Sequence, residues 1–83
     1  MKISVKYFAS IREALGLANE SVLTDAATLA ALRDELIGRG GAYADSLARG
    51  RSVRLAVDQV MCDETFALVE GAEVAFFPPV TGG

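Results

Sequence analysis

Hydrophobic and polar residues alternate at the beginning of the chain. Within residues 2–8, Ile3, Val5 and Tyr7 fall on one side of an extended backbone, and the other residues, ending with Phe8, fall on the opposite side. A period of two is typical of a β-strand that buries one face. The pattern therefore predicts a first strand over residues 2–8, with Phe8 on the solvent side.

A shorter segment with the same period follows after a break. Ser10 is expected to cap a short helical turn, and Gly16 should end it because glycine adopts the left-handed conformation at little cost. Residues 20–24 alternate again, more weakly than the first segment. After so short a connection, this second strand is expected to return antiparallel to the first.

The next segment has the spacing of an α-helix with one apolar face. Thr28 is a good N-cap because its hydroxyl can accept a hydrogen bond from a free backbone N–H of the first turn. The apolar face is expected to contain Leu29, Leu32, Leu36 and Ile37. The solvated side is expected to contain Arg33, Asp34 and Arg39. The glycines that follow, beginning with Gly38, should end the helix.

A connection rich in small residues separates this helix from the next strand. In residues 40–52, Tyr43 and Leu47 are expected to hold one helical turn against the core while the rest crosses the surface. A third strand then follows, in which the alternating apolar residues are Val53, Leu55 and Val57.

The order of the elements predicts the fold. A short strand is expected near residues 60–62, and a last strand over residues 74–77 after a turn at Glu70 and Gly71. This order predicts an α+β fold of the β-grasp, or ubiquitin-like, type: a mixed five-stranded sheet packed on one main helix. The first and last strands should lie side by side and parallel in its centre. The predicted domain covers residues 1–77, and an extended tail covers residues 78–83.

Composition and charge narrow the possible functions. With 83 residues, 52% of them apolar, the chain can form one small core. Its net charge is −3 and its only local group of cations is Arg49, Arg51 and Arg54, which argues against binding to nucleic acid. No apolar run has the length of a membrane span. The lone Cys62 fits a reducing compartment, so a cytoplasmic protein with protein partners is predicted.

The side chains offer little catalytic chemistry. The chain contains no histidine, which removes the commonest general base, the commonest metal ligand and the usual partner of a serine or cysteine nucleophile. Cys62, Asp63 and Glu64 are adjacent rather than convergent, so no metal site is predicted. No Lys, Arg or His stands near Cys62 to lower its thiol pKa, and a structural thiol is favoured over a persulfide carrier.

The C-terminal tail has a different character from the rest of the chain. Its two prolines cannot donate to a strand and favour an extended path away from the sheet. Its two terminal glycines have no β-carbon, so the terminal carboxylate can pass through a channel too narrow for other residues. The segment expected to enter a partner consists of Pro78, Pro79, Val80, Thr81 and Gly82, with the reactive carboxylate on Gly83.

The chain resembles the small subunits of molybdopterin synthase, the MoaD family, along nearly its whole length. The specific part is the unbroken C-terminal string Phe-Phe-Pro-Pro-Val-Thr-Gly-Gly at residues 76–83. Weaker similarities lie in residues 7–13, in residues 28–33 and in residues 56–59. Asp58 departs mildly from the family, in which asparagine is commoner, and this leaves the role of the tail unchanged.

The resemblance implies a sulfur carrier that has no side-chain active site of its own. An adenylyltransferase related to the ubiquitin-activating class would use ATP to adenylate Gly83, and a sulfur donor would convert it to a thiocarboxylate. Inserted into the large synthase subunit, in a heterotetramer of two small and two large subunits, the thiocarboxylate would give its sulfur to cyclic pyranopterin monophosphate during molybdenum cofactor biosynthesis. No bound cofactor is expected.

The alternation also predicts where such partners dock. Phe8 and Phe77 fall on the face opposite Tyr7 and Phe76, which is the solvent face of the sheet. With Met61, they are expected to form an apolar partner interface beside the tail.

Three alternatives share the fold and the tail. They are a thiocarboxylate carrier of another pathway, such as ThiS-like thiamin synthesis or cysteine or tRNA sulfur delivery; a ubiquitin-like modifier joined to lysines through Gly83; and a binding module whose tail is inert. The Phe-Phe-Pro-Pro-Val-Thr segment favours the molybdopterin branch over the other carriers.

Overall fold

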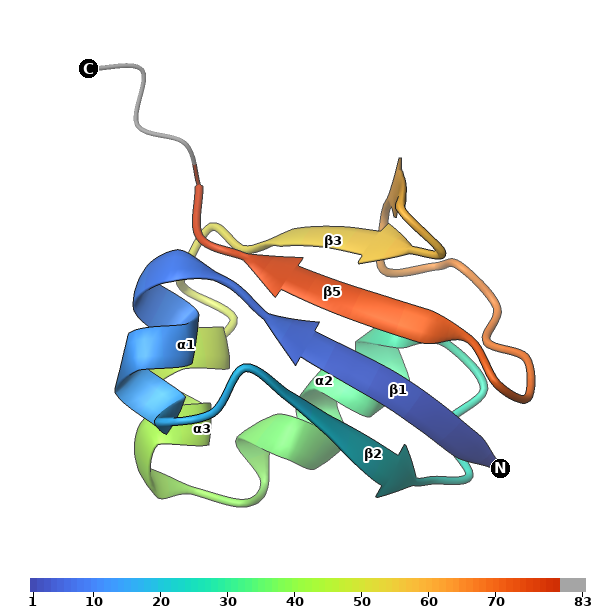
Figure 1. Ribbon diagram of the computed structural model, residues 1–83, viewed down its shortest axis with the longest axis horizontal. Coiled ribbons are helices and arrows are strands. Elements are labelled where there is room, and N and C mark those ends of the chain that lie inside the picture. Colours follow the sequence, from blue (N-terminus) through green and yellow to red (C-terminus); the bar gives the residue numbers. More distant parts are fainter. Residues whose placement is uncertain (80–83) are drawn as a thin grey trace.

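A computed structural model describes residues 1–79 of the chain and shows a mixed sheet crossed on one face by helices (Figure 1). The strands are β1 (Lys2–Tyr7), β2 (Asn19–Leu23), β3 (Arg54–Val57), β4 (Val60–Cys62) and β5 (Glu73–Phe77). The helices are α1 (Ala9–Leu15), α2 (Leu29–Ile37) and α3 (Gly41–Leu47). The strand order is β2-β1-β5-β3-β4, which is the order of a β-grasp sheet and confirms the predicted fold.

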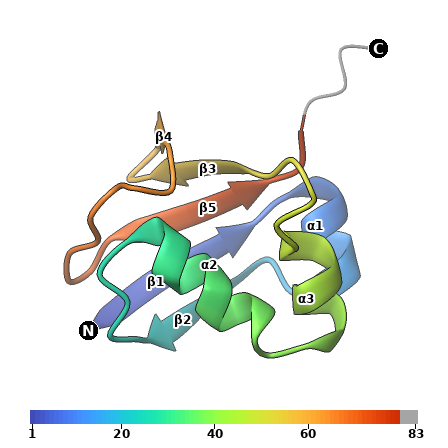
Figure 2. The same cartoon turned by 180° about the vertical axis from the view of Figure 1, so that it is seen from behind.

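The two central strands are the first and the last of the chain. β1 and β5 run parallel, with Val5 opposite Val74 and Tyr7 opposite Phe76, as the sequence predicted. The inward-facing residues of both strands pack under α2, which lies across the sheet in Figure 2. Fully buried side chains of this core are Ile3, Val5, Tyr7, Leu29, Leu32, Leu36, Leu47, Val74 and Phe76.

Two details of the predicted elements are wrong. α1 begins at Ala9 directly after β1, and its N-cap is Phe8 rather than Ser10. The backbone N–H of Phe8 still donates to the carbonyl of Phe76 at 3.2 Å, so the helix starts as soon as the strand pairing ends. In the third strand the apolar alternation also fails, because Ala56 is buried together with its neighbours Leu55 and Val57.

The segment between α2 and β3 contains more helix than its sequence indicated. α3 spans seven residues and is longer than the single turn expected within residues 40–52. Gly40 has a φ of 76°, a left-handed conformation that turns the chain back after α2. Leu47 at the end of α3 is fully buried, whereas Tyr43 is half-buried, so these two residues do anchor the segment as predicted.

The clearest correction concerns Arg33. It was expected on the solvated side of α2, but only 4% of its surface is exposed. Its Nε donates to the carbonyl of Leu47 at 2.7 Å, and its Nη2 donates to the carbonyls of Ala48 at 2.8 Å and Arg51 at 3.2 Å. Its Nη1 forms an ion pair with Glu64 at 2.6 Å. Every nitrogen is thereby satisfied, which is what allows the guanidinium to be buried.

Replacing Arg33 with Met should therefore lower the free energy of unfolding by about 3 kcal/mol, because three backbone carbonyls and one carboxylate lose their buried donor. Arg12→Met on the exposed side of α1 is the matched control, with an expected change within about 0.5 kcal/mol. Urea unfolding followed by circular dichroism measures both. Equal stability of the two variants would contradict the role given to Arg33.

Candidate functional site

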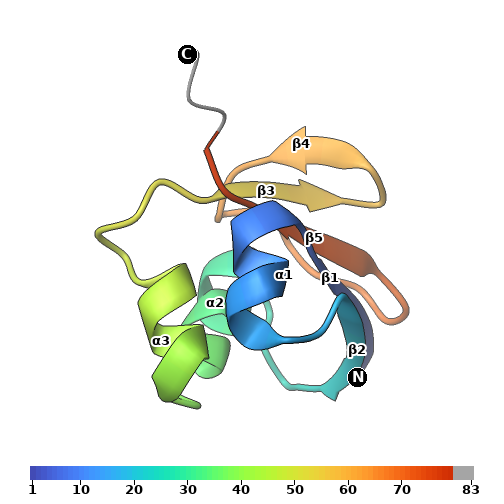
Figure 3. The same cartoon turned by 60° about the vertical axis from the view of Figure 1, so that its left-hand side comes forward.

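The chain leaves the sheet at the end where β1 and β5 both finish. β5 ends at Phe77, and Pro78 and Pro79 follow outside any strand, as expected of residues that cannot donate to the ladder. This exit, formed by Pro78 and Pro79, is called here the tail root. Figure 3 shows it between α1 and the β3–β4 pair. The predicted insertion residues Val80, Thr81 and Gly82, and the reactive Gly83, lie outside the described residues.

Three apolar side chains gather on the outer face of the sheet next to the tail root. The rings of Phe8 and Phe77 are stacked, with centroids 4.6 Å apart and planes 11° apart. Phe8 is 37% exposed and Met61 is 54% exposed. With Pro78 and Pro79 they line an open hollow of about 550 Å³. Phe8, Met61 and Phe77 therefore form one apolar surface, called here the tail-root patch, and its role as a partner interface stays a prediction.

The strand register explains why residues so distant in sequence meet in this patch. Because β1 and β5 are parallel, the residue that follows Tyr7 lies beside the residue that follows Phe76. Met61 of β4 comes to the same face through the pairing of the neighbouring strands. Ala56 of β3 pairs with Met61 on one side and with Ala75 of β5 on the other. The two alanines are almost fully buried although they face outward.

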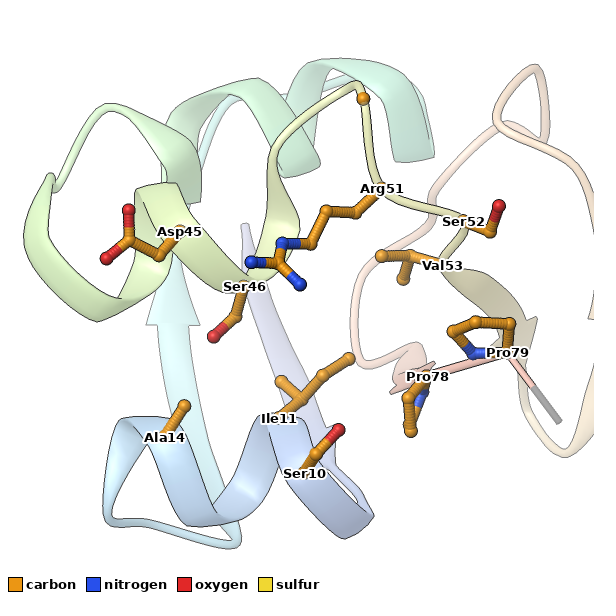
Figure 4. A pocket seen from close by; sticks show the side chains of 11 residues that line it. Ser10, Ile11, Ala14, Asp45, Ser46, Arg51, Ser52, Val53, Pro78 and Pro79 are labelled. Carbon is orange, nitrogen blue, oxygen red and sulfur yellow. The ribbon is translucent and has the colours of Figure 1, made fainter. Parts of the chain in front are cut away.

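A second hollow lies on the other side of the tail root. It has a volume of about 560 Å³ and runs between α1, α3 and the segment before β3 (Figure 4). Ile11 and Val53 supply apolar surface, while Ser46 and Arg51 supply polar groups. Pro78 and Pro79 close one end of it, so the same two prolines border both hollows. No pattern in the sequence predicted this groove.

The hollow beside the tail-root patch is also lined by a cation, which was not predicted at this position. Arg54 lines the same hollow as Phe8 and Met61, and in the register it lies directly opposite Phe77. The only signal in the sequence was the local group of arginines at residues 49–54. The pairing of β3 with β5 was needed to bring one of them to the tail root.

Cys62 is another side chain with candidate chemistry. Burial, helped by the negative charge of Asp63, raises the pKa of the Cys62 thiol, which packs against the core and so is held in its unreactive form. In residues 1–79, no group of three or more His, Cys, Asp and Glu side chains is placed to hold a metal ion. Within the same residues, no helix is long and apolar enough to cross a membrane.

The polar cluster around Glu20 is structural. Glu20 accepts hydrogen bonds from the hydroxyls of Tyr7 at 2.8 Å and Tyr43 at 2.7 Å, and from Arg39 Nη1 at 2.9 Å. The guanidinium of Arg39 also lies 4.9 Å from the centre of the Tyr43 ring. Burial raises the pKa of Tyr7, so this phenol remains a hydrogen-bond donor and does not act as a base. The cluster ties β1, β2 and α3 together, and its Tyr7 belongs to the core face of the sheet.

The chain is similar to known proteins along nearly its whole length. Residues 5–83 match the ThiS family. The molybdopterin synthase sulfur carrier subunit of Escherichia coli (strain K12) is 40% identical over 81 residues, which cover 98% of this chain and 99% of the relative.

Solved structures share the fold. SAMP1 from Haloferax volcanii superposes with a TM-score of 0.80 and 26% identity over 100% of both chains. A complex of subunits 1 and 2 of molybdopterin-converting factor from Helicobacter pylori 26695 contains a chain that superposes with a TM-score of 0.70 and 25% identity, also over 100% of both chains.

The Glu20 cluster should make stability depend on pH. Burial by itself raises the pKa of this carboxyl, but hydrogen bonds from Tyr43, Arg39 and Tyr7 outweigh it and hold the pKa below its ordinary value of 4.5. A lowered folded-state pKa means that the stabilisation is complete above the unfolded-state value and is lost as the pH falls through the folded-state value.

At pH 7, Glu20→Gln should lower the free energy of unfolding by about 2 kcal/mol, because the carboxylate accepts three charge-strengthened hydrogen bonds. The difference from the wild type should shrink as the pH is lowered below 4.5. The control is Glu13→Gln on the exposed side of α1. Urea titrations across this pH range test the idea, and a difference that stays constant with pH would refute it.

Proposed function

The chain belongs to the ThiS family, and we propose that it is the sulfur carrier subunit of a molybdopterin synthase, with the carboxylate of Gly83 as its working group. The observation that carries the proposal is the juxtaposition of the tail root with an exposed apolar surface. Phe8, Met61 and Phe77 leave apolar area in water directly where the Gly-Gly tail departs. A partner that covers this patch also receives the tail.

The relatives support this pathway among those that use such carriers. The 40% identical relative is named a molybdopterin synthase sulfur carrier subunit, and the structure from Helicobacter pylori pairs a similar chain with a second subunit. The modifier alternative has weaker support, since SAMP1, a small archaeal modifier protein, is 26% identical to this chain, whereas the sulfur carrier subunit of Escherichia coli is 40% identical. Branched lysine conjugates of Gly83 recovered from cells would favour that alternative.

The proposed chemistry begins on an activating enzyme and needs no side chain of this chain. An oxygen of the Gly83 carboxylate attacks the α-phosphate of ATP, pyrophosphate leaves, and an acyl adenylate forms. The terminal sulfur of a donor persulfide then attacks the acyl carbon and AMP leaves. A thiol cleaves the resulting acyl disulfide, which yields the thiocarboxylate and a disulfide. ATP is thus a substrate of the activating enzyme, and this chain binds no cofactor.

The second half of the proposal takes place in the large subunit. There the thiocarboxylate sulfur, which is anionic at neutral pH, attacks a carbon of cyclic pyranopterin monophosphate and displaces an oxygen substituent, which forms a thioester with Gly83. Water then hydrolyses the thioester, so that the sulfur stays on the pterin and the Gly83 carboxylate is released. Acid and base groups come from the large subunit, which accounts for a carrier that has no histidine. The pair would assemble in the cytoplasm as a heterotetramer of two small and two large subunits.

Intact mass tests the carrier chemistry. After incubation with the activating enzyme, ATP and a sulfur source, the full chain should gain the mass difference of one oxygen replaced by sulfur. The mass of the chain without Gly83 should not change, because its tail is one residue too short to reach the adenylation centre. An unchanged full chain in the presence of an enzyme that is active on another carrier would overturn the proposal.

A charged residue introduced into the tail-root patch tests whether this surface binds the large subunit. Phe77→Glu should abolish copurification with the large subunit, because a carboxylate would have to be buried in an apolar interface. Leu23→Glu is the matched control, since Leu23 is 81% exposed on the edge strand β2 and remote from the tail root. Circular dichroism verifies that both variants are folded. Binding of the Phe77 variant at the wild-type level would exclude the patch as the interface.

A further inference from the structure

The cations of this chain divide into paired and unpaired groups. Four of its eight Lys and Arg residues form ion pairs with carboxylates, namely Lys6, Arg33, Arg39 and Arg49. The other four, Lys2, Arg12, Arg51 and Arg54, make no ion pair with any carboxylate in residues 1–79. For a chain with a net charge of −3, the position of these unpaired cations is informative.

Two of the unpaired cations stand on opposite sides of the tail root. Arg54 lines the hollow of the tail-root patch, and Arg51 lines the groove on the other side. Both hollows are bordered by Pro78 and Pro79, so each arginine lines a hollow that these two prolines share. Figure 4 shows the side chain of Arg51 extending into its groove, above Ile11 and Ser46.

Both arginines are exposed but rise from a fixed backbone. Arg54 belongs to β3 and pairs with Phe77 of β5. The carbonyl of Arg51 accepts a hydrogen bond from the buried guanidinium of Arg33 at 3.2 Å, which holds the segment before β3 in place. A charge on a fixed backbone loses less freedom on binding than a charge on a mobile loop.

We propose that Arg51 and Arg54 form a basic rim around the tail root that recognises acidic side chains at the mouth of the channel in the large subunit. The inference rests on the proposed function, because it assumes that the large subunit receives the tail. A protein that accepts the tail must surround Pro78 and Pro79, and its surface then faces both arginines. Carboxylates at that position would form charge-assisted hydrogen bonds with the two guanidinium groups.

Such a rim should act mainly on the rate and orientation of association. Exposed charges at the edge of an interface contribute little to affinity but steer the approach of a partner, and salt screens the effect. The chain carries excess negative charge elsewhere, so two cations at one end make its charge distribution asymmetric. This asymmetry orients the chain as it approaches a charged partner. Asp45 also lines the groove of Arg51 but forms no ion pair with it, and this leaves the guanidinium available.

The test compares charge reversals at matched positions. Arg51→Glu, Arg54→Glu and the double variant are measured for association with the purified large subunit by stopped-flow fluorescence at low and high ionic strength. Lys2→Glu is the control, because Lys2 is an exposed, unpaired cation at the opposite end of β1 and its reversal changes the net charge equally. Arg51→Gln and Arg54→Gln separate the loss of a cation from the addition of an anion.

Each reversal at the rim should slow association about tenfold at low ionic strength, and each neutral variant should slow it by less. The control should change the rate by less than about twofold, since Lys2 lies at the far end of β1, away from the surface that approaches the large subunit. The salt dependence of the double variant should be weaker than that of the wild type. Rim variants that associate like the wild type, or a control that slows equally, would overturn the rim.

Failure of the rim and failure of the proposed function give different results. If wild-type chain binds the large subunit and the rim variants bind equally fast, only the rim is wrong. If the wild-type chain does not bind the large subunit at all, both the rim and the proposed function are wrong.

Discussion

The parallel pairing of β1 with β5 is the constraint on which the rest of this molecule depends. It places the first and the last strand of the domain side by side in the middle of the sheet, so that both strands finish at the same end of the sheet. The residues just beyond them, Phe8 and Phe77, therefore stack on each other. The tail begins beside that stack because it continues β5. A sheet in which the last strand lay at an outer edge would separate the tail from the aromatic surface.

The domain provides a rigid base for a reactive group that lies beyond it. Its polar interactions are used for stability: Arg33 holds the segment between α3 and β3, and Glu20 joins two tyrosines to an arginine. Its thiol is held in the protonated form by burial. The exposed end of the sheet carries the apolar surface and two unpaired arginines around the tail root. This division of labour suits a carrier that is handled by other enzymes, since the carrier contributes recognition and a C-terminus while its partners contribute the catalytic groups.

The sequence alone predicted more of the fold than of the candidate site. The period-two patterns and the Thr28 cap predicted the strands and the main helix, because alternation and capping are local properties of the chain. The hydroxyl of Thr28 does accept the N–H of Ala31, at 3.2 Å. Predictions from local sequence were wrong where the environment of a side chain is set by residues distant in the chain. Arg33 looked solvated on a helical projection, yet backbone carbonyls from residues 47–51 surround it.

The sequence by itself determined the element order, the exit of the chain from the sheet at two prolines and the alternation that turns Phe8 and Phe77 outward. These follow from backbone stereochemistry and from the period of each element, both of which are encoded within a few residues. Only the tertiary structure decided which residues share the tail root: the pairing of β3 with β5 that sets Arg54 against Phe77, and the groove between α1 and α3 that holds Arg51. Those positions depend on strand register and helix packing, which join residues far apart in the chain and have no local pattern.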